Sequence, residues 1–357
     1  MSSQHFLCLV ASIPGVSMVH FSRALCRSAI ASMLFAACAG GPVQAEIPGG
    51  IKAEYKRPVE IPFPPGNPYT PEKAALGKAL FFEPRLSGAE NINCATCHNP
   101  SFGWEGASKT AIGAQSTRLA RQAPTVLNTA WIHPFFWDGR AETAEEQAVG
   151  PIQADVEMNM PMDLLVDRLK GIPGYQSWFE KIFPNEGVRS ETVAKAIATF
   201  ERTVVASYAP FDAWIDGDEA AISESAKRGF QLFVGKAECS KCHTGWNFSD
   251  NKFHDIGTTS TDIGRGKIDK ADSLAMYAFK TPSLRDTAQR APYMHNGEWA
   301  TLEDVMRHYV TGGVDRPSRS PLMKPVNVSD AEIADIIAFL KSLTGSKQVV
   351  TLPILPN

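Results

Sequence analysis

Two short stretches decide the fold of this chain of 357 residues: Cys94-Ala95-Thr96-Cys97-His98 and Cys239-Ser240-Lys241-Cys242-His243. The pattern C-x-x-C-H is the attachment signal of c-type haem, in which the two thiols bond the vinyl groups and the histidine ligates the iron. A zinc site would need both cysteine pairs in one place and no histidine after each pair. A redox dithiol normally accompanies a βαβ unit, which the sequence lacks. We therefore predict two covalent haems c, one on each motif.

The first 45 residues have the order of a secretory signal peptide. No acidic residue precedes Glu46, and two arginines lead into the apolar run 28–37, which is followed by the small-x-small sequence 43–45. The apolar run is shorter than the ~20 residues of a membrane span. We predict a signal peptide over residues 1–45 and an exported, periplasmic protein with no membrane span in the mature chain. The alternatives are a membrane anchor, a lipoprotein acylated at Cys38, and a start at Met18.

Removal of this leader would change both the net charge and the number of cysteines. The mature chain would carry 33 basic and 38 acidic residues, a net charge of −5 before haem propionates are added. A mildly acidic surface gives no support for nucleic-acid binding. Three of the seven cysteines leave with the leader. The four that remain are those of the two motifs, so no cysteine is left for a disulfide.

The sequence around the two motifs repeats. Gly77-Lys78-Ala79-Leu80-Phe81 precedes the first motif and Gly229-Phe230-Gln231-Leu232-Phe233 precedes the second, and both read as the end of an amphipathic helix. Each half closes with a helical pattern, and the second of these begins with the capping-box sequence Ser329-x-x-Glu332. Strand-like alternation is scarce. We predict a mainly α fold of two cytochrome c-like domains, each with one haem, over residues 46–206 and 207–357.

The repeat also indicates which residues face the two irons. In each half a proline is followed fifteen residues later by a glycine, and twelve positions after that glycine stand Pro151 in the first half and Tyr309 in the second. Proline has no ligating side-chain atom, whereas a phenolic oxygen can bind ferric iron. The first haem is therefore expected to be open at its sixth position, and Tyr309 is a candidate ligand of the second. The alternatives are an ordinary packed tyrosine and ligation by Met276, Met294, Met306 or Met323.

An open haem iron that meets hydrogen peroxide needs an acid–base group to move a proton between the two peroxide oxygens. Glu157 is the candidate because it lies between Val156 and Met158, where its pKa would be raised. A solvated loop glutamate is the alternative. Gln147 is a candidate for orienting the peroxide. Trp137 is a candidate electron relay because indole can be oxidised by haem, although a core tryptophan is the commoner role.

These motifs carry a family resemblance. The chain resembles the bacterial di-haem cytochrome c peroxidase family, and within it the MauG type. The resemblance covers essentially the whole mature chain. Besides the two haem motifs it rests on the runs 75–82, 123–128, 136–140, 147–151 with Glu157-Met158-Asn159, 207–214 and 292–303.

The resemblance implies a role for each half. The haem on His98 would react with peroxide, the haem on His243 would transfer electrons, and Trp137 would couple the two. The distal side of the first haem would hold Gln147, Pro151 and Glu157.

The family also has a calcium ion between the two domains. The resemblance places its backbone carbonyl ligands at Arg290 and Pro292. Its side-chain ligand is an asparagine in the family, and this position is Gln122 here. The resemblance therefore implies a calcium site in which Gln122 stands in place of the family's asparagine.

Two positions indicate the MauG type. The distal histidine that blocks the first haem of ordinary peroxidases falls at Ala114, which cannot ligate. Their axial methionine falls at Tyr309, fourteen residues after His295, so the family alignment selects the same tyrosine as the repeat. A hard phenolic oxygen favours ferric and higher oxidation states. The resemblance thus implies that hydrogen peroxide forms a high-valent di-haem state that oxidises a protein substrate. In the MauG type the substrate is a precursor of methylamine dehydrogenase, and the product is its tryptophan tryptophylquinone cofactor.

Two other functions stay open. One is peroxide detoxification with a small redox protein, such as a cytochrome c or a cupredoxin, as electron donor. The other is a pure electron carrier, against which Ala114 and Pro151 argue because neither can close the first haem. One departure bears on the substrate: the tryptophan that serves as electron exit in MauG falls at Ala237 here. Trp246 is near this position in the sequence.

Overall fold

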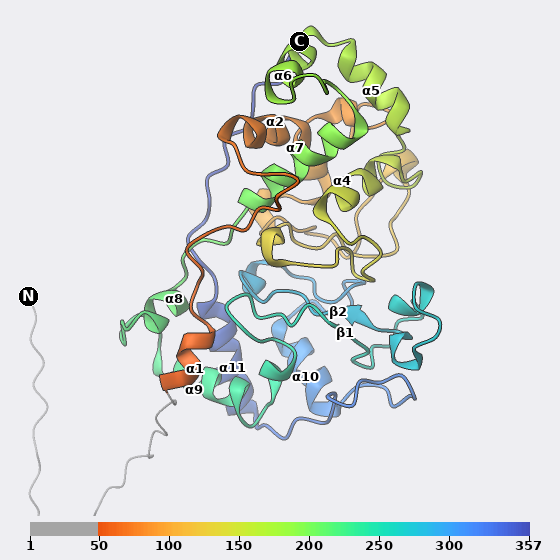
Figure 1. Cartoon of the computed structure of the whole chain (residues 1–357). Coiled ribbons are helices and arrows are strands. Elements are labelled where there is room, and N and C mark those ends of the chain that lie inside the picture. The colour runs from red at the N-terminus through yellow and green to blue at the C-terminus, as the bar shows by residue number, and fades with distance from the viewer. Residues whose placement is uncertain (1–48) are drawn as a thin grey trace, which may run out of the picture. The chain divides into compact units, whose positions relative to one another are not determined.

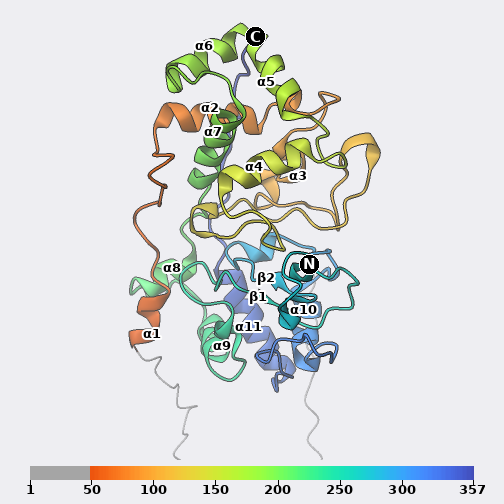
Figure 2. The same ribbon diagram turned by 45° about the vertical axis from the view of Figure 1, so that its right-hand side comes forward.

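The computed structural model describes residues 49–357, which are mainly helical (Figure 1; Figure 2). Residues 1–48, and with them the predicted signal peptide, lie outside the described residues. No helix within residues 49–357 is long and apolar enough to cross a bilayer.

The described chain holds eleven α-helices and two short strands. The helices are α1 (Gly49–Glu54), α2 (Pro71–Phe81), α3 (Cys94–Cys97), α4 (Ala144–Gln153), α5 (Met162–Lys170), α6 (Pro173–Ile182), α7 (Ser190–Thr203), α8 (Pro210–Ile215), α9 (Glu224–Val234), α10 (Leu302–Thr311) and α11 (Asp330–Ser342). In residues 49–357 the only strands are β1 (Phe253–His254) and β2 (Phe279–Lys280), which pair antiparallel. The mainly α prediction is confirmed.

Each half is built on a packed pair of helices, α2 with α7 and α9 with α11 (Figure 1). The glycines of the two repeated sequences lie at these contacts. A Cβ on Gly77 would overlap the carbonyl oxygen of Ala196, and a Cβ on Gly229 would overlap that of Asp335. Both glycines are needed because they let two helix backbones touch. This contact fixes the helix that leads into each haem motif.

Two hydrophobic cores surround these helix pairs. The first takes side chains from α2, α5, α6 and α7, including Leu80, Phe179 and Ile197. The second is aromatic: Phe230 of α9 and Phe339 of α11 lie with ring centroids 5.4 Å apart. Such tilted and edge-on ring contacts stabilise a core beyond the burial of area alone.

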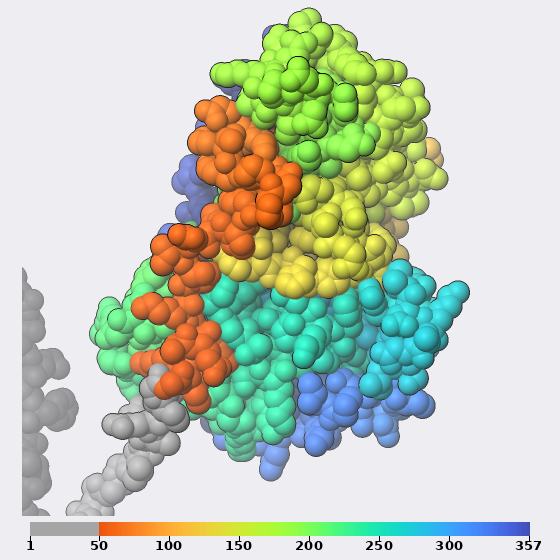
Figure 3. All heavy atoms as spheres, viewed as in Figure 1, coloured from red at the N-terminus to blue at the C-terminus, as the bar shows by residue number. Residues whose placement is uncertain are grey.

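Each end of the described chain packs against the half to which it does not belong in sequence. Tyr55, directly after α1, is 1% exposed and packs against Phe230 of the second core at 5.1 Å. From there the chain runs over the surface to α2, as the orange segment of Figure 3 shows. At the other end, Leu355 packs against the first core and the Arg85 guanidinium donates to the Pro356 carbonyl at 2.8 Å. Each core is therefore completed by a distant segment, and the boundary at residues 206 and 207 stays a prediction.

Buried polar contacts join the halves between these crossings. The guanidinium of Arg290 pairs with the carboxylate of Glu105 at 2.5 Å, and both side chains are buried. Nearby, Asn128 donates to Asn247 at 2.8 Å, again between buried side chains. Since a half-satisfied buried charge costs several kcal/mol, roughly 3–5 by typical measurements, the Arg290–Glu105 pair favours one arrangement of the two halves.

Candidate active site

A cavity of about 470 Å³ lies beside the first C-x-x-C-H motif, with Cys97 and His98 in its wall. This volume is in the range of cofactor sites. The motif forms the short helix α3, whose cap is Asn93: its side chain accepts from the backbone N–H of Thr96 at 3.0 Å. Desolvation lowers the pKa of His98, which keeps the imidazole neutral as an iron ligand must be. The cavity therefore fits a haem attached at this motif.

Four residues predicted from the sequence line this same cavity: Trp137, Gln147, Pro151 and Glu157. Gln147 and Pro151 lie one turn apart on α4, a helix that begins with a capping box formed by Thr143 and Glu146. One face of α4 therefore presents an amide and a proline ring to the cavity. The structure brings together the whole predicted distal set, although their roles in peroxide chemistry stay predictions.

Glu157 is the acid–base candidate of this cavity. Desolvation raises the pKa of its carboxyl, and the nearby charge of Arg140 opposes this shift in part. Arg140 is itself held by Asp138 at 3.0 Å and lies 3.5 Å from the centroid of the Phe136 ring. Glu157 therefore keeps its proton to a higher pH than a solvated glutamate, which agrees with the expectation from its apolar neighbours.

The loop that carries a blocking histidine in ordinary peroxidases is tied down next to Glu157. The backbone N–H of Ala114 donates to the Glu157 carbonyl at 2.8 Å. The methyl group of Ala114 offers no ligand, so this loop has no side chain at that position to close the first haem.

The cavity wall also contains charged residues that the sequence analysis missed. Burial raises the pKa of Glu201 on α7 to about 8, and burial lowers the pKa of Lys280 to about 7. The ammonium group of Lys280 donates to the Pro134 carbonyl at 2.6 Å. Glu201 could have been found by its helical spacing, because it follows the buried Ile197 by four residues. Lys280 lies in strand β2, which gives no such signal.

At the second motif, the structure assigns the tautomer of the predicted proximal histidine. The Nδ1 atom of His243 lies 2.9 Å from the Phe248 carbonyl oxygen. A carbonyl oxygen only accepts, so Nδ1 carries the proton and donates, and Nε2 is left free for iron. Desolvation lowers the pKa of His243 and keeps the ring neutral. The geometry fits a haem on Cys239, Cys242 and His243.

Tyr309 occupies the place in the second half that Pro151 occupies in the first. Both are the eighth residue of their helix, Pro151 in α4 and Tyr309 in α10. Both helices also begin with a capping box on a threonine, Thr143 and Thr301. Desolvation raises the pKa of Tyr309. The structure thus supports the equivalence that the repeat predicted, while iron ligation by Tyr309 stays a prediction.

Trp137 and the predicted calcium residues lie together where the halves meet. The indole N–H of Trp137 donates to the backbone carbonyl of Gln122 at 2.9 Å. The side-chain amide of Gln122 in turn donates to the Pro292 carbonyl at 2.6 Å. Gln122 is 2% exposed.

Ala237 and Trp246, the two positions considered above for an electron exit, differ in how far they are buried. Ala237 is 4% exposed and belongs to the second core. Trp246 is half-buried and makes an edge-on contact with Trp131 at 4.7 Å. The structure therefore gives Trp246 an aromatic neighbour but does not identify an exit route.

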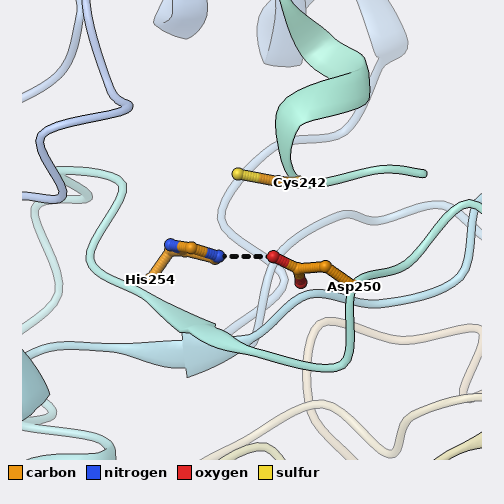
Figure 4. A group of neighbouring side chains, drawn as sticks. All are labelled: Cys242, Asp250 and His254. Atoms are coloured by element: carbon orange, nitrogen blue, oxygen red, sulfur yellow. Dashed lines mark hydrogen bonds and ion pairs between the residues drawn. The ribbon is translucent and has the colours of Figure 1, made fainter.

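One further group of side chains has the composition of a metal site: Cys242, Asp250 and His254, whose potential ligand atoms lie within 4.8 Å of one another (Figure 4). Cys242 belongs to the second haem motif, so its sulfur would be a thioether rather than a thiolate. The remaining pair is an ordinary part-buried contact in which His254 lies 2.8 Å from Asp250. Desolvation disfavours the charge on His254, but the hydrogen bond and the charge of Asp250 favour it and raise the pKa of the imidazole.

Comparison with known proteins agrees with this geometry. The family model described as di-haem cytochrome c peroxidase matches residues 71–220, and the cytochrome c model matches residues 226–344. The methylamine utilization protein MauG of Methylorubrum extorquens is 52% identical over 309 residues, covering 86% of this chain and 88% of the relative. MauG of Methylophilus methylotrophus is 46% identical over 309 residues, covering 86% and 92%.

A solved structure shows the same architecture. The crystal structure of a MauG-like protein associated with microbial copper homeostasis superposes with a TM-score of 0.75 at 30% identity, covering 82% of this chain and 95% of that one. The fold is thus two cytochrome c-type domains, and the cofactors are two haems c. Together with the two C-x-x-C-H motifs, these matches show that the chain is an oxidoreductase that belongs to the di-haem cytochrome c peroxidase family and is similar to its MauG members.

Proposed function

We propose that this protein is an exported, periplasmic enzyme of the MauG type. It uses hydrogen peroxide to oxidise side chains of a methylamine dehydrogenase precursor and so completes the tryptophan tryptophylquinone cofactor of that enzyme. The observation that carries the proposal is the pairing of Pro151 with Tyr309 at the same position of equivalent helices. This pairing supports a first haem that the residue at position 151 cannot close and a second haem that a phenolic oxygen would ligate.

Each of the cavity residues Glu157, Gln147 and Pro151 has a separate role in peroxide activation. Glu157, with its raised pKa, takes a proton from one peroxide oxygen and returns it to the other. Gln147 would orient the peroxide through its amide, and Pro151, which also lines the cavity, would offer no ligating atom to a bound haem. The bound haems supply the redox chemistry and store the two oxidising equivalents of the peroxide.

Trp137 and Tyr309 connect this chemistry to the second half. Trp137 lines the first cavity, and its indole N–H is fixed by the Gln122 carbonyl at 2.9 Å. A fixed aromatic ring between the halves is suited to relay electrons from the second haem to the first. The phenolic oxygen of Tyr309 would be a hard ligand to the iron of a haem held at the second motif and would favour its oxidised states, so that this haem could share the oxidising equivalents.

The experiment that tests this function uses the purified di-haem protein, a methylamine dehydrogenase precursor and hydrogen peroxide. We expect quinone absorbance to appear together with methylamine-oxidising activity. The Tyr309→Met variant should lose both, yet still turn over peroxide with a small electron donor, because the first haem is unchanged. If the wild-type protein forms no quinone but rapidly oxidises a small cytochrome c or cupredoxin, the proposal is wrong.

The second candidate function is peroxide removal with such a small redox protein as donor. The description of the matching family model favours it, and one solved relative is associated with copper homeostasis rather than methylamine utilization. The same assay decides between the two candidates, since they differ in the reductant and share the peroxide cavity.

A further inference from the structure

Gln122 makes two hydrogen bonds to the second half and also accepts one from Trp137 of its own half. Its backbone N–H donates to the His295 carbonyl at 2.8 Å, and its backbone carbonyl accepts from the Trp137 indole at 2.9 Å. Its side-chain amide donates to the Pro292 carbonyl at 2.6 Å and lies 3.4 Å from the Gly106 carbonyl. One buried residue thus holds the second half at two points and fixes Trp137 at a third.

These contacts do not fit a calcium ion at the place the family resemblance implies. Calcium takes six to eight oxygen ligands, typically at about 2.3–2.6 Å. Here the Pro292 carbonyl accepts an N–H of Gln122, and an amide nitrogen that carries hydrogens cannot ligate a cation. Glutamine is one methylene longer than asparagine, and this extra length lets the amide reach the carbonyl directly.

The charges nearby give no substitute ligands. Glu105, the carboxylate beside Arg290, is already paired with the Arg290 guanidinium at 2.5 Å. In the part of the chain that the structure describes, the only group of three acidic, histidine or cysteine side chains arranged for a metal is Cys242, Asp250 and His254.

We propose that Gln122 replaces calcium in this protein: its amide joins the two haem-bearing halves by a hydrogen bond and positions Trp137 between them without a metal ion. The backbone carbonyl of Gln122 accepts from the Trp137 indole, and the side chain of Gln122 donates to Pro292. Loss of the side-chain contact would therefore also displace Trp137. Gln122 is a positioning residue, since it acts on the relay through Trp137.

The metal content of the protein tests this directly. The purified di-haem protein is incubated with excess calcium, dialysed against metal-free buffer and analysed by mass spectrometry for bound calcium, with iron as the internal count of haem. We expect well below one calcium per two irons, and the same thermal midpoint with and without the chelator EGTA. One firmly bound calcium per chain, or a midpoint that falls with EGTA and recovers with calcium, would overturn the proposal.

Two variants test the hydrogen bond itself. Gln122→Met keeps the length of the side chain but removes the donor, so the thermal midpoint should fall and calcium should not restore it. Gln122→Asn shortens the side chain by one methylene and frees the Pro292 carbonyl, so its midpoint should rise when calcium is added. Gln176→Met makes the same change at an exposed position on α6, where the lost contact is a 3.2 Å hydrogen bond to Glu180, and should leave the midpoint unchanged.

Ultraviolet resonance Raman spectroscopy of the indole reports on the positioning role. Gln122→Met should shift the tryptophan band that responds to hydrogen bonding of the indole N–H, and this shift should disappear in a Trp137→Phe background. An unchanged midpoint together with an unchanged Raman band in Gln122→Met would show that Gln122 neither joins the halves nor positions Trp137. These readouts do not depend on the identity of the oxidised substrate, so the proposed function can fail while this inference stands, and the reverse.

Discussion

At the scale of single residues, the chemistry of the first cavity depends on what surrounds one carboxyl group. Glu157 is desolvated, which raises its pKa, and Arg140 compensates only in part. The same glutamate in water would be ionised throughout the physiological range and would be a weaker proton acceptor. Ala114, whose backbone N–H donates to the Glu157 carbonyl, has only a methyl side chain and so offers no ligand for a haem.

Glu157→Gln should slow the reaction with peroxide by ~10²–10⁴-fold, the usual contribution of general acid–base catalysis, while both haems are retained. As a proton acceptor Glu157 must first lose its own proton, so the wild-type rate should rise with pH through its raised pKa and level off above it. The variant should lack this rise. Stopped-flow absorbance in the Soret band over a pH series measures both effects.

Glu142→Gln is the matched control, since Glu142 is exposed and its carboxylate lies outside the residues that line the cavity. Its rate and pH profile should equal those of the wild type. If Glu157→Gln also reacts at the wild-type rate with an unchanged profile, the acid–base role belongs to another group, of which Glu201 is the first to examine.

At the scale of elements, the repeated helix pairs set the position of each haem motif. α2 packs on α7 and α9 on α11 through glycines with no room for a side chain. Each pair fixes the helix that leads into its haem motif. α4 and α10 then carry Pro151 and Tyr309 at matching positions, so equivalent helices present a proline in one half and a tyrosine in the other.

Gly229→Ala should destabilise the protein because its Cβ would overlap the Asp335 carbonyl and crowd Phe339. Overpacking of this kind typically costs ~1–3 kcal/mol of unfolding free energy. Gly66→Ala is the control, since no atom lies within 4 Å of the Cβ position there, and it should change stability by less than about 0.5 kcal/mol. Denaturant unfolding followed by circular dichroism measures both. Equal stabilities of the two variants would show that the α9–α11 contact is looser than described.

The sequence predicted these elements because each has a local signal. The haem motifs, the glycine-containing repeats and the capping box at Ser329 are contiguous patterns, and spacing alone paired Pro151 with Tyr309. The contacts it missed join distant residues. Tyr55 packs in the second core, and Leu355 packs against the first core. No local sequence pattern predicts either of these long-range contacts. The bond from Gln122 to Pro292 depends on the length of one side chain at a tertiary contact.

At the scale of the whole molecule, the two halves are held in one arrangement. The crossing terminal segments and the buried pair of Arg290 with Glu105 fix the halves against each other. Trp137 lies where they meet, held by Gln122. The MauG-type proposal requires the two halves to be held together in this way. One peroxide molecule would deliver two oxidising equivalents to a single open haem, and the second haem would have to share them.

The central claim is that Tyr309 lets both irons hold oxidising equivalents, and Mössbauer spectroscopy of isotopically enriched protein tests it most directly. After one equivalent of hydrogen peroxide, both iron signals of the wild type should move away from the ferric state. In Tyr309→Met, whose thioether raises the potential of the second haem, only the iron on His98 should move. A wild-type spectrum in which only one iron changes, with the other equivalent on a porphyrin or protein radical, would contradict the account and favour a conventional peroxidase.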